Sequence, residues 1–347
     1  MSAIRTFAGL CSAAILGLIQ PLSPAQAADQ ITLRVEHFLP PQSTAQVGLL
    51  EPWAKKVMAA SHGRLKIEIY PAMQLGGKPP QLYDQVKDGV IDAAWTLPGY
   101  TPGRFPTSEV FELPFMITTA AATSRALYEF YEKHLQKEFA DVHPLAFHVH
   151  ARGLIHTREK AVTKIEDLKG LKLRAPTRRV GQMLEELGAT QIGMPVPQVP
   201  EALSKNVIDG AVVPYEVIVP LRVHELTKYH AQLDGKHGLY TSVFIFAMNK
   251  RKYDSLPADL KKAIDDNSGA ALSQEAGRIW DQADVDGYEI TKKAGGQFTS
   301  IGGAEAERFR KAAEPVIAEW IADMNKRGFD GKTLYNDALS LIEKYSK

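Results

Sequence analysis

Hydrophobic and polar residues alternate in two short segments near the start of the chain, 31–38 and 65–69. Alternation with a period of two is typical of a strand with one buried face. Between these segments, the apolar residues of 50–58 follow a helical spacing. Further on, Pro80 opens another helical segment, which Gly89 ends before an apolar run. The order strand, helix, strand predicts α/β layers around a largely parallel sheet.

A short phrase of helix and strand signals occurs twice along the chain. Residues 80–95 read PQLYDQVKDGVIDAAW, and residues 200–213 read PEALSKNVIDGAVV. In both, a proline opens a short helical segment and Val-Ile-Asp leads into an apolar run that we interpret as a strand. The matching context on both sides of Val-Ile-Asp favours two lobes that are built alike.

The C-terminal part of the chain carries mostly helical signals. Ser255 is a candidate N-cap with Pro257 in the first turn, and the absence of further proline over 257–292 predicts one very long helix, weakened locally by three glycines. A second helix is expected over 304–326, where apolar residues follow a spacing typical of core packing. We expect Pro315 to kink this second helix.

The first 27 residues have the pattern of a secretory signal peptide. Arg5 is the only charge, the apolar stretch 7–19 is too short to span a bilayer, and Ala25–Ala27 has the small-x-small cleavage pattern. We expect cleavage near Ala27 and an exported product. A lipoprotein would use Cys11, but apolar sequence follows that cysteine, which disfavours lipid attachment there.

The composition narrows the class of protein. Cys11 is the only cysteine and leaves with the signal peptide, so the mature chain relies on its core without a disulfide, as about 320 residues allow. Without Arg5, the 41 Lys and Arg become 40, against 40 Asp and Glu. This balance, with no basic run, argues against nucleic acid or an anionic membrane surface as a partner. The length suggests two domains.

Arg174 stands in a local arrangement that suits an anion. It closes an expected strand in which Lys172 and Arg174 point to the face opposite Leu173, and Thr177 is a candidate N-cap for the helix that follows. In open α/β sheets, ligands lie outside the carboxyl ends of strands, and helix N-termini attract anions. An arginine adds a planar fork that matches a carboxylate. The competing interpretation is a surface salt bridge between Arg174 and Glu185 or Glu186 of that helix.

Six stretches of the chain resemble, in order, those of the solute-binding proteins of tripartite ATP-independent periplasmic (TRAP) transporters of the DctP type. They are HGRLKIEIYPAMQLGG (62–77), VKDGVIDAAW (86–95), FELPFM (111–116), IEDLKGLKLRAP (165–176), VPEALSKNVIDGA (199–211) and MNKRKYDSLPADLKKAI (248–264). The resemblance covers nearly the whole mature chain. It implies a periplasmic receptor whose two lobes close around an organic acid, with Arg174 at the position of the arginine that pairs with the ligand carboxylate.

The fold that the resemblance implies is α/β, the two-lobed periplasmic binding protein fold. Each lobe is expected to hold a mixed sheet flanked by helices, and a hinge and a long C-terminal helix to join them. The expected division is a signal peptide over 1–27, lobe I over 28–151 plus 239–280, and lobe II over 152–238 plus 281–347.

The chain departs from relatives of two kinds. Sialic-acid-type members carry a second ligand arginine on the strand before a Thr/His-rich turn, where this chain has Gly153 with Arg152 beside it. A second carboxylate clamp is therefore in doubt. Metal-using members have a Gln/Glu/Trp-rich stretch where this chain reads AVVPYEV (211–217), so we expect no metal there.

Further candidates for the ligand site follow other expected strands. His148 and His150 face the same side of one strand; a zinc site lacks supporting motifs, and we favour His150 as a neutral hydrogen-bond donor at the cleft. Trp95 and Phe38 follow two strands of one lobe and are expected to form an apolar wall, although core packing also accounts for Phe38. Tyr215 follows the mirrored strand of the other lobe.

These observations favour a binding protein that delivers an organic acid to a TRAP permease. The chain has no nucleophile elbow, P-loop or dinucleotide fingerprint, so we expect neither an enzyme nor a cofactor. One expected ligand arginine with aromatic neighbours indicates an aromatic monocarboxylate. A C4-dicarboxylate, with Arg152 or Arg178 on its second carboxylate, is the alternative ligand. A periplasmic hydrolase or lyase on the same scaffold and a receptor for a sensor kinase are the alternative functions. We expect a monomer.

Overall fold

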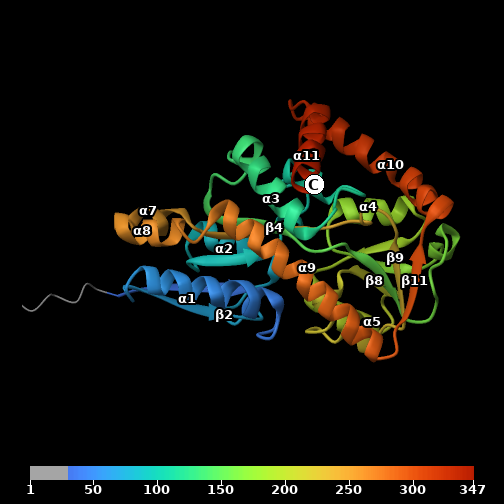
Figure 1. Ribbon diagram of the computed structural model, residues 1–347, viewed down its shortest axis with the longest axis horizontal. Coiled ribbons are helices and arrows are strands. Elements are labelled where there is room, and N and C mark those ends of the chain that lie inside the picture. Colours follow the sequence, from blue (N-terminus) through green and yellow to red (C-terminus); the bar gives the residue numbers. More distant parts are fainter. Residues whose placement is uncertain (1–29) are drawn as a thin grey trace, which may run out of the picture.

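Two mixed β-sheets, each flanked by helices, organise the chain (Figure 1). The computed structural model describes residues 30–347, so the predicted signal peptide and its cleavage near Ala27 lie outside the described residues. The first sheet has the order β2-β1-β3-β10-β4 and the second β11-β9-β5-β8-β6-β7. The strands are β1 (Ile31–His37), β2 (Leu65–Tyr70), β3 (Ala93–Thr96), β4 (Val142–Val149), β5 (Leu154–Thr157), β6 (Lys172–Ala175), β7 (Thr190–Gly193), β8 (Gly210–Val213), β9 (Tyr229–Leu233), β10 (Val243–Asn249) and β11 (Gln297–Ile301).

The two sheets share one strand pattern, which confirms that the lobes are built alike. β1 lies between β2 and β3 with all three parallel, and β6 lies between β7 and β8 in the same way. An antiparallel strand follows on one side in each sheet, β10 in the first and β5 in the second. A further antiparallel strand then closes the pattern, β4 and β9 respectively, and β11 extends the second sheet alone.

The aspartate of each Val-Ile-Asp phrase binds the neighbouring parallel strand just before the paired residues of the two strands begin. Asp92 accepts a hydrogen bond from the Arg34 amide through its carboxylate (2.8 Å) and donates its own amide to the Arg34 carbonyl (3.1 Å). Asp209 does the same with Lys172, at 2.8 Å for both bonds. The repeated phrase therefore marks an equivalent strand clamp in each lobe, and it aligns β6 next to β8.

The helices pack on both faces of the sheets and cross between them. They are α1 (Glu51–Ala60), α2 (Leu82–Asp88), α3 (Ala120–Phe130), α4 (Arg178–Glu186), α5 (Val199–Ser204), α6 (Tyr215–Ile218), α7 (Lys250–Ser255), α8 (Ala258–Asp265), α9 (Gly269–Lys293), α10 (Gly303–Lys326) and α11 (Gly331–Tyr345). Figure 1 shows α9 running obliquely from the side of the first sheet to the side of the second. Within residues 30–347, every helix is too short or too polar to span a lipid bilayer.

The long helix predicted over 257–292 is broken in the structure. α8 ends at Asp265 and α9 begins at Gly269, whose φ of 79° is outside the helical region. Ser268 lies at this break, where its hydroxyl accepts a hydrogen bond from the Trp53 indole (3.3 Å). The prediction that Ser255 caps a helix is also wrong, because Ser255 is the last residue of α7.

Two glycines of α9 allow close contact with one helix start in each lobe. A Cβ at Gly277 would lie 2.4 Å from the Ala120 carbonyl oxygen at the start of α3, and a Cβ at Gly287 would lie 2.4 Å from the Tyr215 carbonyl oxygen at the start of α6. Both distances are below van der Waals contact with backbone atoms. These glycines therefore serve the packing of α9 against both lobes.

Two aspartates between those glycines cap the same two helices. The Asp281 carboxylate accepts hydrogen bonds from the amides of Ala120 (2.8 Å) and Ala121 (2.9 Å). Asp284, one turn further along α9, accepts from the Glu216 amide (3.2 Å). Free amides at helix starts and carboxylates stabilise each other through hydrogen bonds and the helix dipole. α9 thus anchors both lobes within a few residues of one another.

The last helix returns to the first sheet. α10 lies against α4 beside the second sheet and continues through Pro315, whereas α11 packs against α3, which covers β4 of the first sheet. The expected division of the chain grouped residues 281–347 with lobe II. From here on, lobe I denotes the first sheet with its helices, including α11, and lobe II denotes the second sheet with its helices.

Candidate functional site

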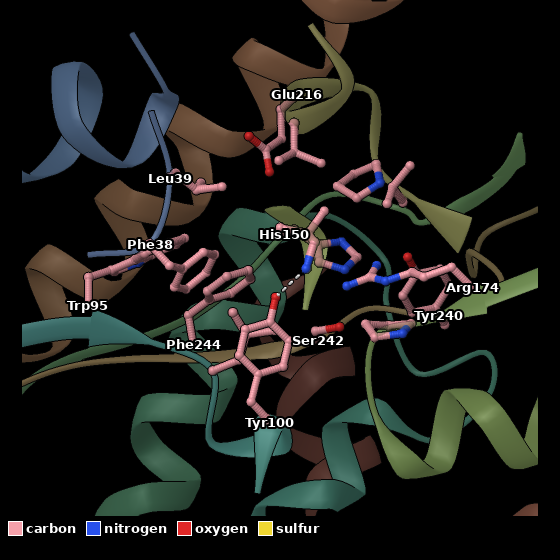
Figure 2. A pocket seen from close by; sticks show the side chains of 16 residues that line it. Phe38, Leu39, Trp95, Tyr100, His150, Arg174, Glu216, Tyr240, Ser242 and Phe244 are labelled. Carbon is pink, nitrogen blue, oxygen red and sulfur yellow. Dashed lines mark hydrogen bonds between the residues drawn. The ribbon is translucent and has the colours of Figure 1, made fainter. Parts of the chain in front are cut away.

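A pocket lies between the lobes (Figure 2). It is lined by residues of both sheets and of the two connections between the lobes, which are residues 150–153 and 234–242. About 350 Å³ of space between the lining residues is free of atoms, part of it open to solvent. The lining residues are Phe38, Leu39, Trp95, Leu97, Tyr100, His150, Arg174, Pro176, Val196, Val213, Pro214, Glu216, Val217, Tyr240, Ser242 and Phe244. One side of the pocket is polar and the other is aromatic.

Arg174 is the buried cation of the polar side. It lies on β6, its side chain is 2% exposed, and it extends toward His150 (Figure 2). Its Nε donates to the Met194 carbonyl (2.9 Å) and one terminal nitrogen donates to the Val212 carbonyl (3.1 Å), which fixes the guanidinium plane. Burial lowers its pKa. Among residues 30–347 no carboxylate forms an ion pair with Arg174, so the alternative salt bridge with Glu185 or its neighbour is not formed.

Hydroxyl groups beside Arg174 add hydrogen-bonding capacity. The Tyr240 hydroxyl and the Ser242 hydroxyl are buried, and no described residue gives either of them a partner. The Tyr100 hydroxyl is held by the Val196 amide, which donates to it (3.0 Å). A buried polar group without a partner costs about 1–3 kcal/mol, so a ligand that pairs with Tyr240 and Ser242 recovers that cost.

His150 is neutral and presents an acceptor to the pocket. Its Nδ1 donates to the carbonyl of Ala151, and burial lowers its pKa to about 3. A neutral imidazole with a proton on Nδ1 has none on Nε2. The expectation of a neutral histidine at the cleft agrees with this environment, but the expected donor role is wrong, because the donating nitrogen is already used by a backbone carbonyl.

Three stacked rings form the aromatic side. Trp95 stacks on Phe38, with 5.0 Å between ring centroids and 27° between planes, and on Phe244, with 4.7 Å and 14°. The Trp95 indole N–H donates to His148 Nε2 (2.7 Å), which holds the ring in place from behind. Trp95 is 1% exposed, so it is both core and pocket wall. Such faces favour a flat apolar or aromatic group.

The structure separates Arg152 and Tyr215 from the other four expected site residues. Arg152 donates to the carbonyls of Thr118 (2.8 Å), Gly235 (2.8 Å) and Lys236 (2.7 Å), so its donors hold the connections between the lobes together. Tyr215 packs among aromatic residues of lobe II. Both line a different cavity next to α9, whereas Phe38, Trp95, His150 and Arg174 line one pocket.

The Tyr240 ring occupies the space that a side chain at position 153 would take. A Cβ at Gly153 would lie 2.1 Å from a ring carbon of Tyr240, and the two residues form an isolated bridge between the connections. No side chain fits at 153 while the Tyr240 ring is there. A tyrosine thus fills the space beside Arg174 where a second arginine was considered from the sequence.

The part of the chain that the structure describes offers no set of ligands for a metal ion. Residues 30–347 contain no cluster of three or more His, Cys, Asp or Glu side chains suited to a metal ion. His148 on β4 and His150, which directly follows β4, have separate partners. His148 accepts a hydrogen bond from Trp95, and His150 donates one to the Ala151 carbonyl.

Comparison with known proteins identifies the family of this chain. The family model described as bacterial extracellular solute-binding protein, family 7 (DctP) matches residues 35–323. The chain belongs to this family. Its members and the solved structures it resembles are solute-binding receptors of TRAP transporters, and not enzymes. Such receptors are periplasmic, bind small organic acids and work with membrane permease components.

Two solved structures resemble this family 7 receptor over nearly its whole length. A TRAP solute-binding protein of Rhodoferax ferrireducens T118, in complex with copurified benzoate, is 48% identical with a TM-score of 0.90, covering 91% of this chain and 99% of that one. A marine metagenome TRAP solute-binding protein described as specific for aromatic acid ligands, in complex with 3-hydroxybenzoate, is 48% identical with a TM-score of 0.91, covering 92% and 100%. The outer membrane transporter protein TsaT of Comamonas testosteroni is 28% identical over 329 residues, 93% of this chain and 94% of TsaT.

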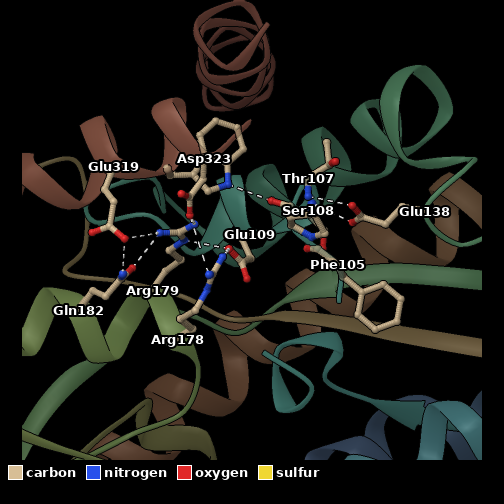
Figure 3. Close-up of polar contacts among 12 residues, drawn as sticks. Phe105, Thr107, Ser108, Glu109, Glu138, Arg178, Arg179, Gln182, Glu319 and Asp323 are labelled. Atoms are coloured by element: carbon tan, nitrogen blue, oxygen red, sulfur yellow. Dashed lines mark hydrogen bonds and ion pairs between the residues drawn. The ribbon is translucent and has the colours of Figure 1, made fainter. Parts of the chain in front are cut away.

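A network of ion pairs joins the two lobes of the receptor beside its pocket (Figure 3). Glu109 lies on the 3-10 turn Ser108–Glu112, which packs against β10 of lobe I. Its carboxylate accepts from Arg178 (2.7 Å) and Arg179 (2.8 Å) at the start of α4 in lobe II. Arg179, which is 0% exposed, also donates to Asp323 of α10 (2.9 Å). The network begins four residues after Arg174.

Sequence reasoning missed four polar residues of the receptor's pocket: Tyr100, Tyr240, Ser242 and Glu216. Tyr240 and Ser242 lie on the second connection between the lobes, where the sequence has no periodic pattern to indicate an inward side. Glu216 directly follows Tyr215, the residue that was expected in the site. α6 begins at Tyr215, so the helix turns Tyr215 toward lobe II and its neighbour into the pocket.

Proposed function

We propose that this chain is the receptor of a TRAP transporter that captures an aromatic monocarboxylate by lobe closure and delivers it to the membrane permease. The observation that carries the proposal is the pairing of Arg174 with the aromatic wall. Arg174 is buried without a carboxylate partner in the described chain, and three stacked rings lie on the other side of the same small pocket. A ligand with one carboxylate and one aromatic ring completes both sides.

The charges around the pocket favour a monocarboxylate over a C4-dicarboxylate. A second carboxylate needs a second free cation, because a buried unpaired charge costs several kcal/mol. Arg152 is bound to three carbonyls outside the pocket, and Arg178 is paired with Glu109. The Tyr240 ring takes the space next to Arg174. The benzoate and 3-hydroxybenzoate complexes of the two relatives that are 48% identical support the same ligand class.

Closure of the two lobes around the ligand follows from the positions of Arg174 and the aromatic rings. The ligand carboxylate binds Arg174 on lobe II, and the ring packs against Trp95, Phe38 and Phe244 of lobe I, so both lobes hold one molecule. The Glu109 ion pairs then form at the rim. Contacts made only in the closed form are what allow a ligand to shift an open–closed equilibrium.

The proposal also places the receptor in the periplasm, next to the membrane permease. The segment 1–27 directs export and is cleaved near Ala27, and the mature chain acts as a monomer in the periplasm. Its closed surface is the one that the permease components recognise. The organic acid passes through unchanged.

A ligand screen tests the proposal. The mature chain is melted with benzoate, the hydroxybenzoates, mandelate, succinate and malate, since a bound ligand raises the melting temperature by mass action. We expect stabilisation by aromatic monocarboxylates and little by the dicarboxylates. Recovery of the best ligand is followed by mass spectrometry. A preference for succinate would favour the dicarboxylate receptor, and sustained turnover would favour a hydrolase or lyase.

A further inference from the structure

Glu216 is an acidic residue inside a pocket that is proposed to bind an anion. It is 6% exposed and lies across the pocket from Arg174 (Figure 2). Its Oε1 accepts a hydrogen bond from the Trp280 indole of α9 (3.0 Å), which fixes the carboxyl group. Its Oε2 is buried and has no hydrogen-bond partner among the described residues. One oxygen is therefore anchored and the other remains available to a ligand.

The surroundings keep this carboxyl group neutral. Burial raises the pKa of Glu216 to about 8, the nearby Asp284 raises it further, and the hydrogen bond from Trp280 together with the polar Thr44 hydroxyl nearby opposes the rise. Since Trp280 donates to Oε1, the proton of the neutral acid belongs on Oε2. A neutral carboxyl both donates and accepts through that atom, so it suits an uncharged polar group such as a hydroxyl.

We infer that Glu216 is a specificity-determining residue, which binds a ring hydroxyl of the ligand while Arg174 binds its carboxylate. This inference rests on the proposed function and narrows its ligand class to hydroxylated aromatic acids. A second carboxylate does not fit, because no free cation lies beside Glu216 in the described chain. An ammonium group would require the ionised form of the residue, which its burial opposes.

The test compares benzoate with its three hydroxybenzoate isomers by isothermal titration calorimetry at pH 7. We expect at least one isomer to bind the wild-type chain about tenfold more tightly than benzoate, since leaving Oε2 unpaired costs about 1–3 kcal/mol. Glu216→Met keeps the length of the side chain and removes its hydrogen bonds. In that variant the isomer and benzoate should bind within about twofold of each other, while Glu216→Gln should retain part of the preference through its amide donor.

A matched control comes from the other buried acid of this region. Glu112 also has its pKa raised to about 8 by burial, and one of its oxygens also lacks a partner, but it does not line the Arg174 pocket. Glu112→Gln should leave the ratio between the hydroxybenzoate and benzoate unchanged. A loss of the ratio in this control as well would overturn the assignment to Glu216, because any buried acid would then have the same effect.

A pH series with wild type and Glu216→Gln keeps the inference testable if the methionine variant does not fold. The charged and titratable groups around Glu216 are Asp284 on α9 and, across the pocket, Arg174, His150 and Tyr240. Ionisation of Glu216 should reduce the hydroxyl preference of the wild type between pH 7 and pH 9, and the Gln variant should show no such reduction. Equal pH dependence in both would contradict the inference.

The outcomes separate this inference from the proposed function. If benzoate binds and no isomer is preferred, or if Glu216→Met keeps the preference, the role of Glu216 is refuted and the aromatic-acid receptor stands. Tighter binding of 3-(aminomethyl)benzoate than of every hydroxybenzoate would also refute it, since that ligand selects an ionised Glu216. If no aromatic acid binds, the proposed function fails, and the inference fails with it.

Discussion

Replacing Arg174 by methionine should almost abolish ligand binding while the protein stays folded. Methionine keeps an unbranched stem like that of arginine and lacks the guanidinium, so it tests the guanidinium itself. Arg174 is 2% exposed and forms no ion pair with a carboxylate of the described chain, so in the proposed complex the ligand supplies its counter-charge. Removing one partner of a buried ion pair costs about 3–5 kcal/mol, which is about a 10²- to 10³·⁵-fold loss of affinity.

The rise in melting temperature that the ligand causes should shrink as the affinity falls. With ligand at about 1,000 times the wild-type Kd, binding contributes about 4.1 kcal/mol to stability. A thousandfold loss of affinity makes the ligand concentration equal to Kd, and the contribution becomes RT ln 2, or about 0.4 kcal/mol. Differential scanning fluorimetry with benzoate resolves this difference, and calorimetry gives the two Kd values.

The ligand-free protein should change little, because two effects oppose each other. The carbonyls of Met194 and Val212 lose their donors, which costs about 1–3 kcal/mol each if they stay buried. The variant also no longer buries a charge without a counter-ion, a cost of several kcal/mol in the native protein.

Arg152→Met is the matched control, since Arg152 binds three carbonyls outside the pocket. It should lower the ligand-free melting temperature and keep the ligand-induced shift. The reasoning is refuted if Arg174→Met lowers the ligand-free melting temperature sharply and keeps the affinity.

Three further predictions concern stability and closure. Gly277→Ala should destabilise the protein by about 1–3 kcal/mol in urea denaturation, because its Cβ would meet the Ala120 carbonyl at 2.4 Å; an unchanged midpoint would mean that α9 shifts freely. Burial raises the pKa of both Glu112 and Glu216 to about 8. The native state therefore binds their protons more tightly than the unfolded chain does, and stability should fall as pH rises from about 4.5 to about 8, by up to about 1.4 kcal/mol per pH unit for each group. Denaturation at several pH values should show a flatter profile in the Glu112→Gln/Glu216→Gln variant, and parallel profiles would contradict this. Glu109→Gln should raise the ligand dissociation rate in stopped-flow measurements more than it changes the association rate, because it weakens contacts of the closed form.

The sequence was informative where a local pattern decides the structure. The alternating segments near the start became β1 and β2, and the two Val-Ile-Asp phrases became equivalent clamps in the two lobes. The succession of strand end, arginine and helix start indicated an anion at Arg174, and the resemblance to DctP-type proteins implied that this anion is the ligand carboxylate. Trp95 and Phe38 were expected at the ends of strands of the same lobe, and they line the same pocket as Arg174.

Features that depend on distant contacts could not be predicted. The break before Gly269 has no proline to mark it, and its Ser268 is held by Trp53, more than 200 residues away. Arg152 and Arg174 both lie near strand ends, and only the positions of the carbonyls around Arg152 show that its donors are used. The choice between Tyr215 and Glu216 depends on the residue at which α6 begins, a difference of one position that no periodicity resolves.

The anchoring of both lobes to α9 has a mechanical consequence. Asp281 holds the start of α3 and Asp284 the start of α6, and three residues of helix separate them by about 4.5 Å along the axis. Because the two attachment points are so close, a rotation of one lobe about them moves its distant residues much further than the residues next to α9. In the proposed closure, a small change in the turn that contains both aspartates would become a large displacement at the pocket rim. In the proposed closure, sequence changes in this turn would therefore adjust how often the empty receptor closes, with no change in any residue that lines the pocket.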